Sequence, residues 1–306
     1  MKREVSVIIL TLNEEIHLRR CIENVKPWVR DIFVVDSFST DGTVEIAREL
    51  GAEVYQNKWL GLYALQFNWA IDNLPVKTKW VLRLDADEYL SQELIEEIGE
   101  KLEGLPEDVT GVIFKRRHIF QGRWIKRGVY PVKLLRLFRY GKGRCEQRLM
   151  DEHIELLEGR AVEFDGDFSD DNRRDIGWWT EKHNGYALRE AVDLLDLEYG
   201  FLQPPSGCNK VVEKESGLVG QAAAKRAKKV RYARMPLFWR SFAYFCYRYF
   251  LRGGFWEGKE GFLWHFLQGW WYRTLVDAKV LELKRASGGD REKLVEVLRD
   301  KYGLLR

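Results

Sequence analysis

Short apolar runs alternate with amphipathic stretches in the N-terminal part of the chain. The sequence predicts four strands, at residues 5–10, 32–36, 53–55 and 80–84, and the first is a short, continuous, β-branched run that predicts a buried strand. Between these runs apolar residues recur at helical spacing, as they do over 18–25. Strands that alternate with helices predict a parallel sheet joined by right-handed crossovers. We therefore expect an α/β fold with a mostly parallel sheet flanked by helices.

Polar residues follow three of the predicted strands, at the point where each strand ends. Thr11–Glu15 follows the first strand, Asp36–Thr43 the second and Asp85–Glu88 the last. Ligands of parallel sheets bind at the carboxyl ends of the strands, so these segments form the candidate site. The first segment contains no glycine, which excludes the dinucleotide-binding fingerprint. Asp41 has a simpler interpretation as a cap of the next helix.

Asp85 and Asp87 carry the sharpest chemical signal. Two carboxylates separated by one residue in a turn after an apolar strand can project toward one point. Mg²⁺ usually combines one or two carboxylates with the phosphates of a substrate. A cation held in this way neutralises charge on a departing diphosphate. Such pairs are also common in solvated turns, and it is the position after a buried strand that favours a metal site.

The three polar segments together resemble the family 2 glycosyltransferases of the GT-A fold. The resemblance extends over roughly residues 4–190, and its motifs occur in the family's order and at its approximate spacing. They are Thr11-Leu12-Asn13-Glu14, Asp36-Ser37 with Ser39–Thr43, and Asp85-Ala86-Asp87. The GT-A fold that this implies is Rossmann-like, with a mostly parallel sheet flanked by helices. A C-terminal helical region rich in aromatic and basic residues follows here.

Further motifs resemble the branch of this family that builds lipopolysaccharide cores and other surface glycans. They are Met150–His153, Trp178-Trp179, Lys182–Asn184 with Tyr186-Ala187, and Gly254–Phe262. The branch implies an inverting, metal-dependent enzyme that moves one hexose from a nucleotide sugar, UDP-linked, to a membrane-anchored saccharide such as a lipopolysaccharide core. The alternatives are transfer to a polyprenyl-phosphate carrier or a protein, or a non-catalytic lipid-surface protein of the same fold.

The resemblance also implies a donor site. Asp85 and Asp87 would hold Mg²⁺ or Mn²⁺ against the diphosphate, with Asp87 the closer ligand. Asp36 would face the base of the nucleotide. The implied nucleotide-sugar contacts are Thr11, Asn13, Glu14, Asp36, Ser37, Gln66 and Asp85.

The Asp151-Glu152 pair matches the position where the family places its catalytic base. Glu152 aligns with the base and Asp151 precedes it, whereas the commoner family pair is Glu-Asp, so either residue could act. His153, Trp178, Lys182 and His183 are candidate contacts to the diphosphate or the acceptor. Each has a structural alternative, as a hydrogen-bonded histidine, a core aromatic or a solvated helix face.

The processive synthases of the family carry a Gln-x-x-Arg-Trp signature, which is missing here. Only a broken form occurs, at Gln121-Gly122-Arg123-Trp124. Addition of a single sugar is therefore favoured over polymerisation.

The net charge of +3 is too balanced for a protein that coats nucleic acid, but it is unevenly distributed. Residues 225–252 hold nine Lys and Arg and no acid, so the rest of the chain carries −6. Five of the twelve Trp residues lie after position 230. Arg240, Tyr244, Arg248 and Arg252 are spaced by four along one helical side, and the three arginines would suit the basic margin of an interfacial helix. This composition favours an anionic membrane surface as a partner; a packed helical subdomain or a homodimer interface is the alternative.

The helical pattern breaks at Gln203–Gly207. We expect a catalytic domain over 1–224, with 201–224 a mobile loop or linker, and a basic, aromatic helical region over 225–306.

The four Cys form no Cys-x-x-Cys pair, which disfavours a disulfide framework or a cysteine zinc site and favours a reducing compartment. No signal peptide or membrane-spanning apolar stretch is visible, so we expect a cytoplasmic protein, peripheral on the inner face of the cytoplasmic membrane.

Overall fold

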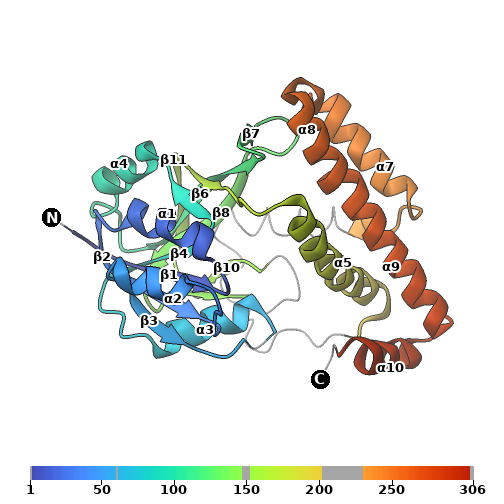
Figure 1. The fold of residues 1–306 in the computed structure, drawn as a ribbon, viewed down its shortest axis with the longest axis horizontal. Helices are drawn as coiled ribbons and strands as arrows, with labels where there is room; N and C mark the ends of the chain where they lie inside the picture. Colours follow the sequence, from blue (N-terminus) through green and yellow to red (C-terminus); the bar gives the residue numbers. More distant parts are fainter. Residues whose placement is uncertain (1, 60, 147–151, 202–229, 304–306) are drawn as a thin grey trace. The chain divides into compact units, whose positions relative to one another are not determined.

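A computed structural model describes residues 2–59, 61–146, 152–201 and 230–303. These residues form two compact units, one ending at Arg173 and the other starting at Arg174 (Figure 1). Each unit is described by itself below.

The first unit is built on a nine-stranded sheet in the order β3-β2-β1-β4-β8-β6-β11-β5, with β7 paired to β6. The half that contains β3, β2, β1 and β4 is parallel. In the other half β8 runs antiparallel to its neighbours, and β11 is parallel to β6 but antiparallel to β5. The strands are β1 (Arg3–Thr11), β2 (Val29–Asp36), β3 (Glu53–Gln56), β4 (Trp80–Asp85), β5 (Glu88–Leu90), β6 (Val109–Phe120), β7 (Arg123–Ile125), β8 (Val132–Arg139) and β11 (Arg160–Asp170). A separate ladder pairs β9 (Gly143–Cys145) with β10 (Ile154–Leu156).

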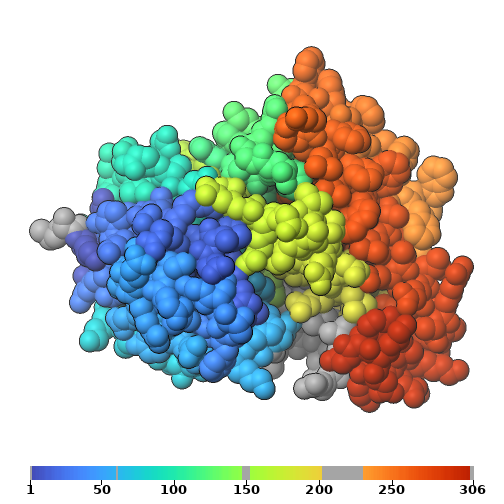
Figure 2. All heavy atoms as spheres, in the orientation of Figure 1, coloured from blue at the N-terminus to red at the C-terminus, as the bar shows by residue number. Residues whose placement is uncertain are grey.

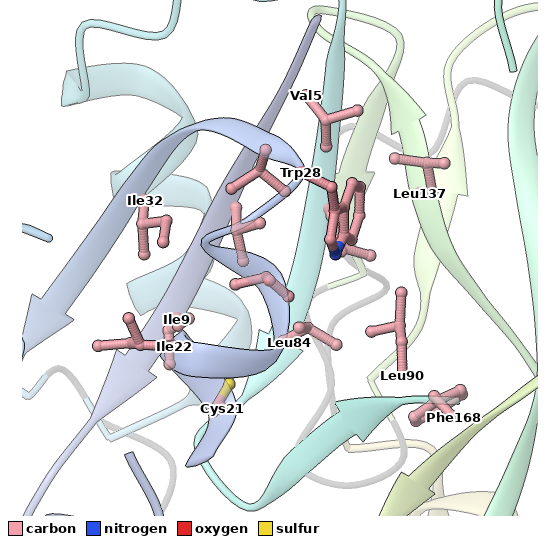
Figure 3. Packing of buried hydrophobic residues seen from close by; sticks show 14 of the residues in the cluster. Val5, Ile9, Cys21, Ile22, Trp28, Ile32, Leu84, Leu90, Leu137 and Phe168 are labelled. Atoms are coloured by element: carbon pink, nitrogen blue, oxygen red, sulfur yellow. The ribbon is translucent and has the colours of Figure 1, made fainter. Parts of the chain in front are cut away.

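Both faces of the parallel half are covered by helices, which explains why β1, β2 and β4 are rich in buried apolar residues, whereas the edge strand β3 is only partly buried. Side chains of β1 alternate between two cores. Val5 and Ile9 share one core with Cys21 and Ile22 of α1 (Figure 3), and Ile8 belongs to the other core, with α3. The helices of this unit are α1 (Glu15–Val25), α2 (Thr43–Glu49), α3 (Tyr63–Asn73) and α4 (Gln92–Lys101). The four predicted strands and the α/β fold class are confirmed.

The ends of α1 follow from local chemistry. The Glu14 carbonyl accepts the N–H groups of His17 and Leu18, at 3.0 and 2.9 Å, which starts the helix immediately after the polar segment. The helix ends at Val25, two residues before Pro27, which cannot donate a helical hydrogen bond. The first turn therefore begins at the sheet edge that the sequence marks as the site.

The second unit is helical. It contains α5 (Ile176–Tyr199), α7 (Trp239–Cys246), the π-helical segments η1 (Tyr247–Leu251) and η3 (His265–Trp271), the 3₁₀ turn η2 (Gly254–Glu257), α8 (Gly258–Trp264), α9 (Tyr272–Ser287) and α10 (Arg291–Tyr302). Glu190 of α5 accepts the Tyr272 hydroxyl at 2.6 Å and pairs with Arg273 of α9. The predicted C-terminal helical region is thus present. The predicted division at residue 224 lies outside the described residues, and α5 belongs to this unit.

The basic margin predicted for an interfacial helix is wrong at two of its three positions. Arg240 is 2% exposed, and its Nε donates to Oδ1 of the buried Asp277 at 2.7 Å. Arg248 is 3% exposed, and burial lowers the pKa of its guanidinium. In the described part of the chain no hydrogen-bond acceptor reaches its Nε or Nη2, although the guanidinium carbon lies 5.3 Å from the ring centre of Tyr244. Of the three, only Arg252 is exposed.

Large apolar side chains occupy the outer surface of this unit instead. Trp239 is 72% exposed and Leu251 is 80% exposed. The space-filling view draws α7 to α10 in orange to red (Figure 2). None of the described helices combines the length and apolarity that a membrane crossing requires.

Candidate active site

The ends of four strands lie side by side at one edge of the sheet. In the strand registers, Thr11 of β1 is opposite Asp36 of β2, which in turn is opposite Gln56 of β3. On the other side of β1, Leu10 is opposite Asp85 of β4. The sheet therefore brings the three polar segments identified in the sequence to one edge.

Asp36 is fully buried beneath the loop that follows β2. Its carboxylate accepts hydrogen bonds from the Thr11 hydroxyl at 3.0 Å, the Ser39 amide at 2.9 Å and the Gln56 side chain at 3.4 Å, and it also binds the Ser39 hydroxyl. These bonds satisfy the buried charge and fix the turn from Asp36 to Ser39. Asp36 thus fixes the conformation of the loop that follows β2, and its predicted contact to a base stays a prediction.

The loop after β1 is tied to the loop after β2. Asn13 has a left-handed backbone, with φ of 57°, and its side-chain oxygen accepts the Thr40 amide at 2.8 Å. The Asn13 amide donates to the Ser39 hydroxyl at 2.8 Å, and the Glu14 amide donates to the Thr43 hydroxyl at 2.7 Å. The two loops therefore form one continuous polar rim.

Gln66 of α3 supports the same rim from below. It is fully buried, and its amide nitrogen donates to the Ser37 hydroxyl and to the Asn57 carbonyl, both at 3.0 Å. Its amide oxygen accepts the Asn57 side chain at 2.7 Å. Leu12 and Phe38 are exposed from these loops. Sequence reasoning missed both, although an apolar residue in each polar loop was a visible signal.

Asp85 and Asp87 flank a tight turn between β4 and β5. The Asp85 side chain is 34% exposed and lies over two buried guanidinium groups. Arg83 Nη2 is 3.8 Å from one carboxylate oxygen of Asp85, and Arg136 Nη2 is 3.5 Å from the other. Asp87 is half-buried, and its Oδ2 accepts the Asn172 side chain at 2.9 Å. Two buried guanidinium groups therefore lie next to the Asp85 carboxylate of the acidic turn.

Glu88 is a buried acid that sequence reasoning missed. It accepts a hydrogen bond from the Arg136 guanidinium and another from the Asp85 amide, the latter at 3.0 Å. Burial raises the pKa of its carboxyl to about 8, although Arg136 acts in the opposite direction. The sequence did contain a signal for a buried acid. Arg83 and Arg136 are charged residues inside apolar strands, β4 and β8.

Glu88 makes the stability of the metal-free protein depend on pH. Its pKa is higher in the folded than in the unfolded chain, so its contribution is largest below the unfolded value near 4.5 and is lost as the pH rises through 8. One pKa unit corresponds to about 1.4 kcal/mol, so we expect the unfolding free energy to fall by about 2–3 kcal/mol between pH 6 and 9. Urea titrations in EDTA measure this change. A Glu88→Gln variant should show a flatter profile, and an unchanged slope would contradict the assignment.

Glu152 is positioned by the β9–β10 ladder. The Glu146 amide donates to the His153 carbonyl at 2.8 Å, which places Glu152 close to the start of β10. The Asn68 side chain binds the backbone of Cys145, on β9. It donates to the Cys145 carbonyl and accepts the Cys145 amide, both at 2.9 Å. Burial raises the pKa of the Cys145 thiol to about 11, so this cysteine is unsuited to nucleophilic attack at neutral pH.

Arg83 connects Glu152 electrostatically with the acidic turn. Burial alone would lower the pKa of Arg83, but Asp85, Cys145, Glu88 and Glu152 raise it above its ordinary value. Arg83 Nη1 also lies 3.5 Å from the sulfur of Cys145. Glu152 and the acidic turn therefore belong to one electrostatic site, whereas Asp151 lies outside the described residues.

The other candidate contacts lie on α5, in the second unit. Lys182 Nζ is 4.6 Å from the ring centre of Trp178. His183 stacks on Trp179, with ring centres 3.5 Å apart, and its Nδ1 is 2.8 Å from the Trp179 carbonyl. Trp179 is a core residue. Their predicted contacts to diphosphate or acceptor stay predictions.

The donor chemistry of the acidic turn fits Mg²⁺ or Mn²⁺. Asp85 and Asp87 offer hard carboxylate oxygens, which suit these ions better than sulfur or nitrogen ligands. Among the residues that the structure describes, no group of three or more His, Cys, Asp or Glu side chains could hold a metal on its own. A two-carboxylate site of this kind depends on substrate phosphates for its remaining ligands.

Comparison with known proteins places this site in a family. A model described as glycosyl transferase family 2 matches residues 6–154. The chain is 30% identical over 262 residues to an uncharacterized glycosyltransferase of Rickettsia typhi, covering 82% of this chain and 80% of that protein. It is 33% identical over 150 residues to the lipopolysaccharide core biosynthesis glycosyltransferase LpsC of Rhizobium meliloti, covering 47% and 54%. A crystal structure of glucosyl-3-phosphoglycerate synthase from Mycobacterium tuberculosis with Mn²⁺, UDP and glucosyl-3-phosphoglycerate matches 38% of this chain and 44% of that one, at 23% identity and a TM-score of 0.29.

The matched region coincides with the site. The family model spans the strand ends of the parallel half, the acidic turn and Glu152. The Rickettsia typhi relative extends the match over most of both chains. The chain belongs to glycosyl transferase family 2, and the protein is a glycosyltransferase.

Proposed function

We propose that the protein is an inverting, metal-dependent transferase that moves one hexose from a UDP-sugar to a membrane-anchored saccharide, such as a lipopolysaccharide core. The observation that carries this proposal is the acidic turn of Asp85 and Asp87. It lies beside the polar rim at the strand ends and shares the buried Arg83 with Glu152.

The rim supports a role in holding the nucleotide. Its hydroxyl and amide groups are pre-positioned by buried partners, so little ordering is needed when a nucleotide binds. Phe38 and Leu12 extend from the rim and offer apolar surface to a base. The cation supplied by Mg²⁺ or Mn²⁺, when bound at Asp85 and Asp87, would neutralise charge on the diphosphate.

Glu152 would act on the acceptor. Its carboxylate takes the proton of the acceptor hydroxyl as that oxygen forms a bond to C1 of the sugar. The bond from C1 to the diphosphate oxygen breaks at the same time, and the nucleoside diphosphate leaves. Attack from the face opposite the leaving group inverts the configuration at C1. Arg83 and Arg136 add buried positive charge next to the turn that would hold the diphosphate.

The acceptor class rests on one relative. LpsC is named a lipopolysaccharide core biosynthesis glycosyltransferase, and its match covers about half of each chain. We extend that acceptor class, a lipid-anchored core saccharide, to this protein as part of the proposal.

A nucleotide screen tests the donor. UDP, GDP, CDP and dTDP are added to the protein with and without Mn²⁺, and the melting temperature is measured. A nucleotide at 100 times its Kd stabilises a protein by about 2.7 kcal/mol. We expect the largest shift with UDP and Mn²⁺ together, followed by turnover of a UDP-sugar. If no nucleotide shifts the melting temperature, and no sugar nucleotide is consumed, the non-catalytic alternative is correct.

The outer surface of the second unit supports a peripheral membrane location. Trp239, Phe250, Leu251 and Trp256 are exposed, and residues 230–256 contain no Asp or Glu. Trp favours the boundary between membrane and water, and exposed basic side chains favour anionic lipids. Arg252 is exposed within this stretch, and Lys259 is exposed just after it. This surface would place the enzyme on the inner face of the cytoplasmic membrane, beside a lipid-anchored acceptor.

Vesicle sedimentation tests this location. We expect binding to vesicles that contain phosphatidylglycerol, and we expect Leu251→Glu to weaken it because a charge replaces an apolar contact. Leu197→Glu, on exposed α5, serves as the matched control. If Leu251→Glu binds vesicles as well as the native protein but shifts a dimer to a monomer in light scattering, the surface is a homodimer interface.

A further inference from the structure

The chain segment that leaves the first unit is bound to the acidic turn. β11 ends at Asp170, which is opposite Glu88 in the antiparallel register with β5. The next residue, Asp171, donates its amide to the Asp87 carbonyl at 3.1 Å. Asn172 then donates its side-chain amide to the Asp87 carboxylate at 2.9 Å. The predicted metal ligand is therefore held at both its backbone and its side chain.

Arg20 of α1 fastens the two segments to each other. Its Nη2 donates to the Asp87 carbonyl at 3.2 Å and to the Asp171 carbonyl at 2.8 Å. Its Nη1 forms an ion pair with the Asp171 carboxylate. The guanidinium carbon also lies 4.5 Å from the ring centre of Tyr89, on β5. One planar guanidinium thus joins the acidic turn to the end of β11.

His17 connects the same segment to the loop after β1, which is predicted to contact the nucleotide. It is fully buried, and its Nε2 accepts the Arg173 amide at 2.9 Å. Because Nε2 accepts, the proton of the neutral ring is on Nδ1, which donates to Oε2 of Glu14 at 2.6 Å. The segment is thereby connected to Glu14 as well as to Asp87.

The boundary between the two units follows immediately. The first unit ends at Arg173, and Asp175 caps α5 by accepting the Trp178 amide at 2.9 Å. The chain reaches the helical unit through residues 171–173, which contact both parts of the predicted donor site. We call residues 171–173, with Arg20 and His17, the junction latch.

We propose that the junction latch positions Asp87 for its cation and couples donor loading to how tightly residues 171–173, at the end of the first unit, are held. Asn172, Arg20 and His17 are positioning residues in this scheme and touch neither substrate nor cation. The inference rests on the proposed function, because it requires a donor site at Asp87. Linkage is reciprocal: if the closed latch strengthens cation binding, cation binding strengthens the latch by the same factor.

Cation affinity tests the positioning role. Mn²⁺ is titrated in the presence of UDP, and its free concentration is followed by electron paramagnetic resonance. Loss of a partner that orients a metal ligand typically costs about 10–100-fold in affinity. We expect Asn172→Ala to raise the Kd for Mn²⁺ by about 10-fold or more. Arg20→Lys should act in the same direction, because an ammonium cannot span both carbonyls in the same way. Asn73→Ala is the control, because the Asn73 side chain donates to the Trp69 carbonyl within its own helix.

Hydrogen exchange tests the coupling. The amides of Asp171 and Arg173 are bonded across the latch, so their exchange reports its opening. We expect Mn²⁺ with UDP to slow exchange at both amides in the native protein, and to slow it less in Asn172→Ala. His17→Phe should remove the effect at Arg173, whereas His17→Gln, which retains an acceptor, should restore part of it.

Two outcomes separate this inference from the proposed function. If the native protein binds neither Mn²⁺ nor UDP, the proposed donor site is wrong and the latch has no ligand to serve. If it binds both, but Asn172→Ala and Arg20→Lys keep the native Kd and the two amides exchange at unchanged rates, the latch is only a structural joint. A variant that fails to fold is recognised by circular dichroism, and the remaining variant then decides.

Discussion

Replacing Glu152 with glutamine is expected to slow sugar transfer by about 10²–10⁴-fold, the contribution of a positioned general base. Glutamine has nearly the same size but cannot accept the proton of the acceptor hydroxyl. Binding of UDP with Mn²⁺ should be unchanged, because the proposed nucleotide and cation contacts lie on the loops after β1 and β2, on α3 and in the acidic turn, and Glu152 is not one of them. Single-turnover transfer and a thermal shift with UDP measure the two quantities separately.

The matched control for this variant is Glu155→Gln, on the exposed side of β10. It should transfer sugar at close to the native rate. Asp151→Asn, tested in parallel, decides between the two candidate bases. If Asp151→Asn loses more than Glu152→Gln does, Asp151 is the base and the assignment of Glu152 is wrong.

Replacing Asp87 with asparagine is expected to abolish both transfer and Mn²⁺-dependent binding of UDP. The amide can still accept the hydrogen bond from Asn172, so the turn should keep its shape, but the charge that attracts the cation is lost. Metal stabilisation of a developing charge is worth several kcal/mol, and about 1.4 kcal/mol is tenfold in rate, so a loss of about 10³-fold or more is expected.

Initial rates of UDP-sugar consumption at saturating Mn²⁺ measure this loss. Asp165→Asn, on the highly exposed part of β11, is the control and should retain native activity. If Asp87→Asn turns over a UDP-sugar at the native rate in the presence of EDTA, the acidic turn serves another purpose.

The sequence predicted the parallel half of the sheet because its signals are local. The strands β1, β2 and β4 contain short apolar runs that pack into the two cores against neighbouring helices. The strands from β6 to β11 were not predicted, since they pair antiparallel and parallel over long separations. Arg160 at the start of β11, for example, pairs with Val109 of β6.

The sequence predicted the parts of the site that are motifs at strand ends. It did not predict the parts in which buried charged side chains contact one another. Arg136 and Glu88 lie 48 residues apart, and nothing local marks them as partners. The same limit explains the error at Arg240, whose partner Asp277 is 37 residues away. Arginines repeated at helical spacing indicate a basic face only when no acid far away in the sequence forms a buried ion pair with one of them. The junction latch was missed for this reason as well, since Asn172 and Asp87 are 85 residues apart.

The buried Arg248 has a consequence for how the helical unit responds to heat. A guanidinium withdrawn from water, and with no acceptor at two of its nitrogens among the residues that the structure describes, works against the folded state. Exchanging buried ionic groups for apolar ones of similar volume has stabilised other proteins by about 1–4 kcal/mol. The region where η1 and η3 meet is therefore the place where the helical unit should begin to melt. An Arg248→Met variant should therefore have a higher melting temperature than the native protein, and its catalytic residues are unchanged.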